Sequence, residues 1–300
     1  MITLRLMSRV PIILAAISFC AFLNISHTAY AEHILVFLLG GQSNMSGHGH
    51  SEELPDKLLH QSEIILFHDT SVHSGHPVDR WQILKPAGYV GYDPPRFGPE
   101  IGLGSVLHAQ LGNQYRIALI KHATGGTNLH ADWHPGQSID DTTNFGPEFS
   151  AMIRTTQRAI EILEDQGHAV TLGGMFWVQG EADANANAGQ QYEPNLRHFI
   201  ARIREQFDVP ELPFVYARIL PYTWRKTAKE VRAAMTNIDQ DAEHPAATPG
   251  ALMVPTKGLE THEDQIHFNT PGMLELGRRL ANSLLARSEY IQSLIYDEKD

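Results

Sequence analysis

The chain has 300 residues, of which 42% are hydrophobic, and this length and composition suit one large globular domain with a sizeable core. Its formal net charge of -11 argues against nucleic acid or an anionic membrane as a partner. A single cysteine, Cys20, excludes a framework of disulfides within the chain.

The N-terminus has the three parts of a secretory signal peptide. Two arginines precede an apolar stretch at 10–23, which is too short to span a membrane comfortably, and Ala29-Tyr30-Ala31 fits the small-residue rule of a cleavage site. We therefore predict that residues 1–31 are removed and that residues 32–300 form a single domain in a secreted or periplasmic protein. The cut would also remove Cys20 and any membrane contact of the signal.

The first predicted strand is the apolar run from Ile34 to Leu39. A run this short, rich in Ile, Val, Leu and Phe, is typical of a strand buried on both faces of a parallel sheet. Gly40 and Gly41 allow a sharp turn directly after it, and Ser43 then lies beyond the carboxyl end, where open α/β sheets place their chemistry. Ser43 can be a nucleophile at this position, or it can simply cap a helix that starts there.

Strand-like runs and amphipathic helices alternate along the rest of the chain. The apolar runs lie at 63–67, 116–120, 172–177, 213–217 and 251–254, and helical periodicity marks 192–203, 231–238 and 274–285. This alternation predicts a parallel sheet with helices on both faces.

The loop-rich stretch 46–96 contains many histidines, at His48, His50, His60, His68, His73 and His76. We interpret this stretch as the surround of an active site, in which the role of each histidine stays open. The 17 histidines of the chain invite a metal hypothesis, but His48-Gly49-His50 has no carboxylate cluster at ligand spacing and the zinc signatures are missing. We therefore expect no metal.

Two more polar segments come directly after predicted strands. Gly125-Gly126 follows one strand and Gln179-Gly180-Glu181 follows another. Because the carboxyl ends of parallel strands meet at one edge of a sheet, both segments should lie beside Ser43. The N–H groups of Ser43 and Gly125 and the amide of Gln179 would then form an oxyanion hole with three donors. The alternatives are an ordinary turn at the glycines and helix N-terminal acids at Glu181 and Asp183.

Asp264 and His267, three residues apart near the C-terminus, supply a carboxylate and an imidazole. One tight loop can bring them together, which would give Ser43 a base and an orienting acid. Thr270-Pro271 just beyond is a good helix start, so the pair can also belong to a helix cap, and the two interpretations are compatible.

Four motifs in this order resemble those of the SGNH hydrolases. They are Gly41-Gln-Ser43-Asn44-Met, Gly125-Gly-Thr127, Trp177-x-Gln179-Gly-Glu181-x-Asp183 and Asp264-x-x-His267-Phe. Within that superfamily they look like the sialate O-acetylesterase branch, carbohydrate esterase family six, and the similarity runs from Ile34 to Leu285. It implies a three-layer α/β/α, flavodoxin-like fold with a parallel sheet of about five or six strands.

The resemblance also implies roles for individual residues. Ser43 would be the nucleophile, His267 the base and Asp264 its orienting acid, with no cofactor. Ser43, Gly125 and Gln179 would hold the oxyanion, although many SGNH enzymes have an asparagine where Gln179 stands. The positions expected to contact substrate are Gln42, Asn44, Gly126, Trp133 and Glu181. Glu181 could instead buttress the loop or His267.

The sequence thus predicts a secreted serine esterase that removes acetyl or other small acyl groups from the hydroxyls of a carbohydrate through an acyl-enzyme. Two alternatives are an acyltransferase, in which a sugar hydroxyl replaces water, and a glycan-binding protein on an inactive hydrolase scaffold. The sequence names neither the oligomeric state nor the glycan, so acetyl esters of xylan, sialic acid, pectin and peptidoglycan all stay open.

Overall fold

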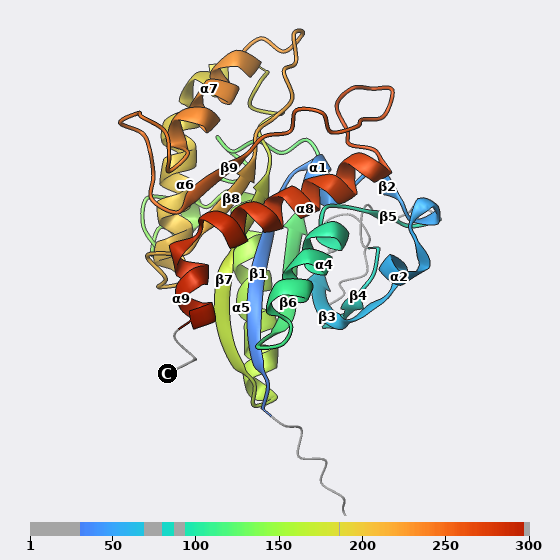
Figure 1. Ribbon diagram of the computed structural model, residues 1–300. Coiled ribbons are helices and arrows are strands. Elements are labelled where there is room, and N and C mark those ends of the chain that lie inside the picture. The colour runs from blue at the N-terminus through green and yellow to red at the C-terminus, as the bar shows by residue number, and fades with distance from the viewer. Residues whose placement is uncertain (1–30, 69–79, 87–93, 186, 297–300) are drawn as a thin grey trace, which may run out of the picture. The chain divides into compact units, whose positions relative to one another are not determined.

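A seven-stranded sheet forms the centre of the computed structural model, which describes residues 31–68, 80–86, 94–185 and 187–296 (Figure 1). In spatial order its strands are β4 (Gln82–Leu84), β3 (Gln61–His68), β6 (Arg116–Ala123), β1 (His33–Gly41), β7 (Ala169–Val178), β8 (Phe214–Ala217) and β9 (Ala251–Val254). All neighbours pair in parallel except β3 and β4. The predicted parallel strands are confirmed, and the short antiparallel edge strand β4 was not predicted.

Helices cover both faces of this sheet. One face carries α4 (Glu100–Leu111), α8 (Thr270–Arg287) and α9 (Glu289–Tyr296), and the other carries α5 (Pro147–Asp165), α6 (Tyr192–Gln206) and α7 (Ala228–Ile238). Figure 1 shows α4 and α8 in front of the central strands, with α5 behind them. The predicted three-layer α/β/α arrangement is therefore confirmed.

The remaining described elements are short. They are α1 (Ser43–Ser46), α2 (Asp56–Leu59), the two-stranded ribbon of β2 (Gly49–His50) and β5 (Arg96–Phe97), and the 3-10 turns Ser51–Glu53, Thr142–Asn144 and Asn187–Gln191. No helix among the described residues has both the length and the hydropathy of a membrane span. The predicted signal peptide lies outside the described residues, apart from Ala31, and stays a prediction.

Strand β1 shows why the first apolar run is unbroken. Alternate side chains face opposite sides of a strand, so Ile34, Val36 and Leu38 enter the core under α5, α6 and α7. Leu35, Phe37 and Leu39 enter the core under α4 and α8. Since both faces of β1 are covered by helices, every position from Ile34 to Leu39 is apolar.

Three strands end together at the carboxyl edge of the sheet. Gly41 pairs with Ala123 of β6 on one side and with Val178 of β7 on the other. Its φ of +147° and the Val178 carbonyl oxygen, which would lie 2.2 Å from an added Cβ, leave room only for glycine. The segments that follow β1, β6 and β7 therefore start side by side, at the point where the strand order reverses.

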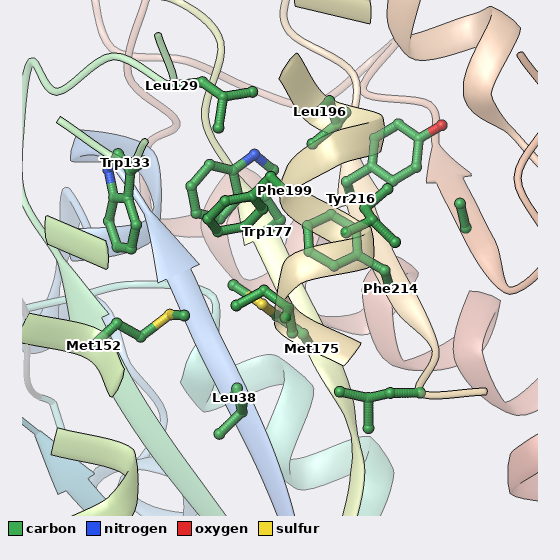
Figure 2. Close-up of a cluster of buried hydrophobic side chains, with 14 of the residues drawn as sticks. Leu38, Leu129, Trp133, Met152, Met175, Trp177, Leu196, Phe199, Phe214 and Tyr216 are labelled. Carbon is green, nitrogen blue, oxygen red and sulfur yellow. The ribbon is translucent and has the colours of Figure 1, made fainter. Parts of the chain in front are cut away.

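A cluster of large aromatic side chains lies on the α5–α7 face below this edge. Trp177 of β7 stands between Trp133 and Phe199, with ring centroids 4.9 Å and 4.7 Å away (Figure 2). The indole N–H of Trp133 donates to Thr127 Oγ1 at 2.9 Å. This cluster therefore fixes the loop that follows β6 to the hydrophobic core.

Candidate active site

Ser43, His267 and Asp264 form a continuous chain of contacts. Ser43 opens α1, two residues past β1, and its Oγ lies 3.1 Å from Nε2 of His267. The other ring nitrogen, Nδ1, lies 2.5 Å from Oδ2 of Asp264. Because an ionised carboxylate only accepts, Nδ1 carries the proton toward Asp264, and Nε2 is left to accept from the serine hydroxyl. This is the order of contacts that a nucleophile, a base and an orienting acid require.

The turn at Asp264 also orients its own carboxylate. Oδ1 accepts hydrogen bonds from the backbone N–H groups of Ile266 at 2.9 Å and His267 at 3.0 Å. Gln265 has a φ of +56°, in the left-handed region that non-glycine residues rarely adopt. Partial burial raises the pKa of Asp264, but these hydrogen bonds and the nearby imidazole outweigh it and hold the pKa at about 2. Asp264 is thus a carboxylate throughout the neutral pH range.

The three side chains differ in their access to solvent. Ser43 is 7% exposed, whereas the side chains of His267 and Asp264 are 23% and 43% exposed. The hydroxyl is therefore less accessible to solvent than the imidazole and the carboxylate beside it.

Asn44 was expected to contact substrate, and its surroundings correct that expectation. The residue is fully buried, and its side-chain N–H groups donate to Glu181 Oε1 at 2.9 Å and to the carbonyl of Ile266 at 3.1 Å. Its Oδ1 accepts from the N–H of Phe268 at 3.1 Å. The neighbour of Ser43 thus grips the residues on both sides of His267.

Glu181 lies behind Asn44 and is 3% exposed. Oε1 accepts from Asn44 and, at 3.5 Å, from the hydroxyl of Tyr222, whereas Oε2 is buried with no hydrogen-bond partner among the described residues. Burial raises the pKa of this carboxyl, and the hydrogen bond from Asn44 opposes the shift. Of the two roles that the sequence left open, this position fits a buttress and does not fit contact with substrate.

Gln42 is likewise turned inward. The residue is 3% exposed, and its Oε1 accepts from the N–H groups of Gly180 at 3.3 Å and Ala182 at 3.2 Å. Its own N–H donates to the carbonyl of Val178 at 2.9 Å. Gln42 therefore ties the end of β1 to the segment after β7, which corrects its expected contact with substrate.

The predicted oxyanion role of Gln179 also needs correction. The residue has no exposed surface, and its Nε2 donates to Asp183 Oδ2 at 2.5 Å and to the carbonyl of Thr127 at 3.1 Å. Its Oε1 accepts from the hydroxyl of Tyr192 at 3.1 Å. Since both amide hydrogens are used in these bonds, Gln179 has no donor left for an oxyanion.

The glycine pair lies at the expected edge of the sheet. The N–H of Thr124 donates to the carbonyl of Gly41 at 3.2 Å, so the loop after β6 starts beside the end of β1. Gly125 is half-buried and Gly126, with a φ of +78°, is exposed. Trp133 is fully buried in the aromatic cluster, so its expected contact with substrate is corrected.

A buried ion pair and a buried histidine–carboxylate contact near the end of β6 support the site, and the sequence analysis missed both. Lys121 Nζ lies 2.8 Å from Glu100 and donates to the carbonyl of Ser46, which ends α1, at 2.9 Å. The next residue, His122, lies 2.8 Å from Glu148 on the opposite face of the strand. The available clue was a lysine that directly follows the apolar run from Ile117 to Ile120, because a buried charge in that position needs a partner.

His48, from the histidine-rich stretch, contacts the site, since its ring stacks on His267. His73 and His76 lie outside the described residues. Among the described residues, no three His, Cys, Asp or Glu side chains are arranged to hold a metal ion.

Comparison with known proteins identifies the family. Residues 33–286 match the family described as carbohydrate esterase, sialic acid-specific acetylesterase. The chain belongs to this family. One relative of this carbohydrate esterase is a probable carbohydrate esterase of Arabidopsis thaliana, which is 22% identical over 271 residues that cover 84% of this chain and 90% of the relative.

Solved structures share the fold of this carbohydrate esterase. An Arabidopsis thaliana protein aligns with a TM-score of 0.67 and 22% identity, covering 85% of this chain and 99% of its own. A carbohydrate acetylesterase from Xanthomonas citri aligns at 0.62 and 18% identity, over 87% and 58% of the two chains. NanS aligns at 0.62 and 13% identity, over 85% and 97%. The family match identifies the chain as a carboxylic ester hydrolase of the carbohydrate esterase type, and these neighbours show that it shares their fold.

Proposed function

We propose that this carbohydrate esterase removes acetyl groups from carbohydrate hydroxyls with Ser43 as its nucleophile. The observation that carries the proposal is the line of contacts from Ser43 Oγ through His267 to Asp264, at 3.1 Å and 2.5 Å. A serine hydroxyl becomes a useful nucleophile when a base takes its proton and a third group orients that base.

The reaction would take place in two half-reactions. Nε2 of His267 accepts the proton of Ser43 as Oγ attacks the ester carbonyl, and the imidazolium then protonates the departing sugar oxygen. This leaves an acetyl group on Ser43. Water, deprotonated by the same nitrogen, attacks the acyl-enzyme, and the imidazolium returns that proton to Ser43 Oγ as acetate leaves. The Asp264 carboxylate stabilises the imidazolium that forms in both halves.

We propose the backbone N–H groups of Ser43 and Gly125 as the oxyanion donors. Both residues lie two positions beyond paired strand ends, since Gly41 of β1 is aligned with Ala123 of β6. Fixed donors aimed at the developing charge stabilise the transition state more than the ground-state carbonyl. Gln179 is left out because its amide hydrogens are bonded elsewhere.

The proposed substrate class is an acetyl ester on a sugar, and the proposed site of action is outside the cytoplasm. The family description names sialic acid, and the Xanthomonas citri neighbour is named a carbohydrate acetylesterase. The signal-like residues 1–31 support secretion or export to a periplasm.

Acetate release from a panel of acetylated glycans, comprising sialic acid, xylan, pectin and peptidoglycan, tests this proposal. Ser43→Ala is expected to lower kcat by about 10⁴-fold or more with the fold intact. Ser62→Ala, which removes an exposed hydroxyl, is the matched control and should behave as wild type. Retention of more than about one hundredth of wild-type kcat in Ser43→Ala would exclude it as the nucleophile.

A further inference from the structure

His48 is held beside the proposed base from two directions. The chain continues from it into the ribbon of β2 and β5, and the N–H of His50 in that ribbon donates to Thr270 Oγ1, at the start of α8, at 2.8 Å. The loop that carries His267 binds from the other side, since His262 Nε2 donates to the carbonyl of His48 at 2.9 Å. The backbone N–H of His262 also donates to the carbonyl of His267 at 2.8 Å. The position of residue 48 is therefore coupled to that of residue 267.

The ring of His48 lies flat against the ring of His267. The two centroids are 3.9 Å apart and the planes differ by 22°. The contacts of His267 with Ser43 and Asp264 lie at its two nitrogens, so they do not prevent the ring from tilting about the line between them. A flat ring in contact with one face opposes that tilt.

His48 is neutral in this arrangement. Arg96 Nη1 lies 3.0 Å from Nδ1 of His48, and because a guanidinium can only donate, Nδ1 bears a lone pair and the hydrogen is on Nε2. Burial and the neighbouring His267, Arg96 and His262 lower the pKa of His48 to about 3, and Asp264 opposes this shift. His267 can therefore accept a proton without facing a second imidazolium.

We propose that His48 is a positioning residue of the esterase, whose neutral ring, bonded to Arg96, keeps the plane of His267 aligned with Ser43. This inference rests on the proposed function of Ser43 and His267. It assigns a role to one of the histidines that the sequence left open.

Two variants of similar volume show whether the effect of His48 requires a flat ring or only a side chain that fills the same space. His48→Phe retains a flat ring and His48→Leu does not, while His60→Ala removes an exposed histidine from the same region as a control. His48→Leu is expected to lower kcat by about 10- to 100-fold, since small misalignments of a reacting group cost rate, and to change KM by less than about twofold. His48→Phe should recover most of that loss, and His60→Ala should match wild type.

The pH dependence of the melting temperature gives a readout that does not depend on catalysis. Unfolded His48 takes a proton as the pH falls below about 6.5, whereas the folded residue does so only at about 3. The unfolded state then binds more protons across this window, so stability is lost as the pH falls through it. Wild type and His60→Ala should therefore lose melting temperature more steeply from pH 6.5 to pH 3 than His48→Phe.

Each result decides one part of the inference. Wild-type kcat in folded His48→Leu, or equal losses in folded His48→Phe and His48→Leu, would overturn the positioning role. Equal slopes of melting temperature against pH for wild type and His48→Phe would overturn the inference that the His48 ring is neutral. Ser43→Ala, assayed in parallel, separates the two proposals: an active Ser43→Ala removes the proposed function and this inference together, whereas an inactive Ser43→Ala beside a fully active His48→Leu removes this inference alone.

Discussion

Glu181 and Asp183 stand two residues apart after β7, and both are buried carboxylates that accept a hydrogen bond from a side-chain amide. Asp183 uses both oxygens, because Oδ2 accepts from Gln179 and from the N–H of Leu129, and Oδ1 accepts from the N–H of His130. Glu181 uses only Oε1, to which Asn44 donates.

This difference in hydrogen bonding matches a difference in role between the two carboxylates. Asp183, with Gln179, fixes the loop after β6 that carries the glycine pair. Glu181 acts through Asn44, which binds the residues on either side of His267. One short segment therefore supports two loops beside Ser43. Asp183, with both oxygens hydrogen-bonded, supports the loop after β6, and Glu181, with one oxygen unpaired among the described residues, supports the loop of His267.

Removal of the Asp183 carboxylate, which uses both of its oxygens, should have the largest effect of these substitutions. Asp183→Ala leaves the amide of Gln179 and the N–H groups of Leu129 and His130 without their acceptor, and each orphaned buried donor costs about 1–3 kcal/mol. We expect the free energy of unfolding to fall by about 3–5 kcal/mol, measured by urea denaturation. Asp165→Ala, at an exposed aspartate, is the control. A loss below about 1 kcal/mol would contradict the structural role.

Removing the hydrogen bonds that Asn44 makes on either side of His267 should mainly affect catalysis. Asn44→Ala removes the bonds to Ile266 and Phe268, so the loop that carries His267 is no longer tied to α1. We expect kcat to fall by about 100-fold with little change in KM, because the base is misplaced by a small distance. Kinetics and a melting curve on the same sample decide the outcome. A drop in melting temperature with wild-type kcat in the folded fraction would make Asn44 purely structural.

Gln179→Ala tests whether the amide of Gln179 supports the structure or takes part in catalysis. The substitution leaves Asp183, Thr127 and Tyr192 each without one partner, so a loss of about 1–3 kcal/mol in unfolding free energy is expected. The kcat of the folded fraction should stay within about threefold of wild type, since the amide does not face the oxyanion. A fall of about 10²–10³ in kcat at unchanged stability would restore the oxyanion role that the sequence suggested.

The smallest effect is expected from Glu181→Gln, which retains the acceptor for Asn44 and removes the charge. Burial raises the folded pKa of Glu181 above its usual 4.5, so the unfolded state loses its proton first and stability is lost as the pH rises above that value. The melting temperature of Glu181→Gln should therefore gain on wild type as the pH is raised from 4.5 toward neutrality. A difference that is constant with pH would show that the carboxyl has no raised pKa.

The sequence predicted the parts of the molecule that depend on local pattern. The apolar runs located all the parallel strands, because the part of each strand that is buried on both faces is mostly apolar. Ser43, Asp264 and His267 could be picked out because each lies at a strand end or in a tight loop, and their side chains do lie in contact. The edge strand β4 and the ribbon of β2 and β5 have two or three residues each, too few for a periodic pattern.

The sequence analysis failed where the direction of a side chain decided its role. Gln179 and Asn44 occupy the predicted positions, but spacing does not show whether an amide points into the site or into the protein. Trp133 follows a glycine-rich loop, a setting as compatible with a surface aromatic as with the core cluster it joins. The stack of His48 on His267 joins segments far apart in the chain, which no local pattern encodes.

The hydrogen bonds of Asn44 on either side of His267 also bear on the stage of folding at which the proposed active site can form. The bonds of Asn44 to Ile266 and Phe268 join residues 222 and 224 positions apart, so loop closure comes late and the chain must be nearly complete before they form. Strands β1, β6 and β7 can pair earlier, but Ser43 then has no base beside it. An unfinished chain would therefore carry Ser43 without its proposed base, and the proposed hydrolysis would begin only when the segment that holds His267 has docked.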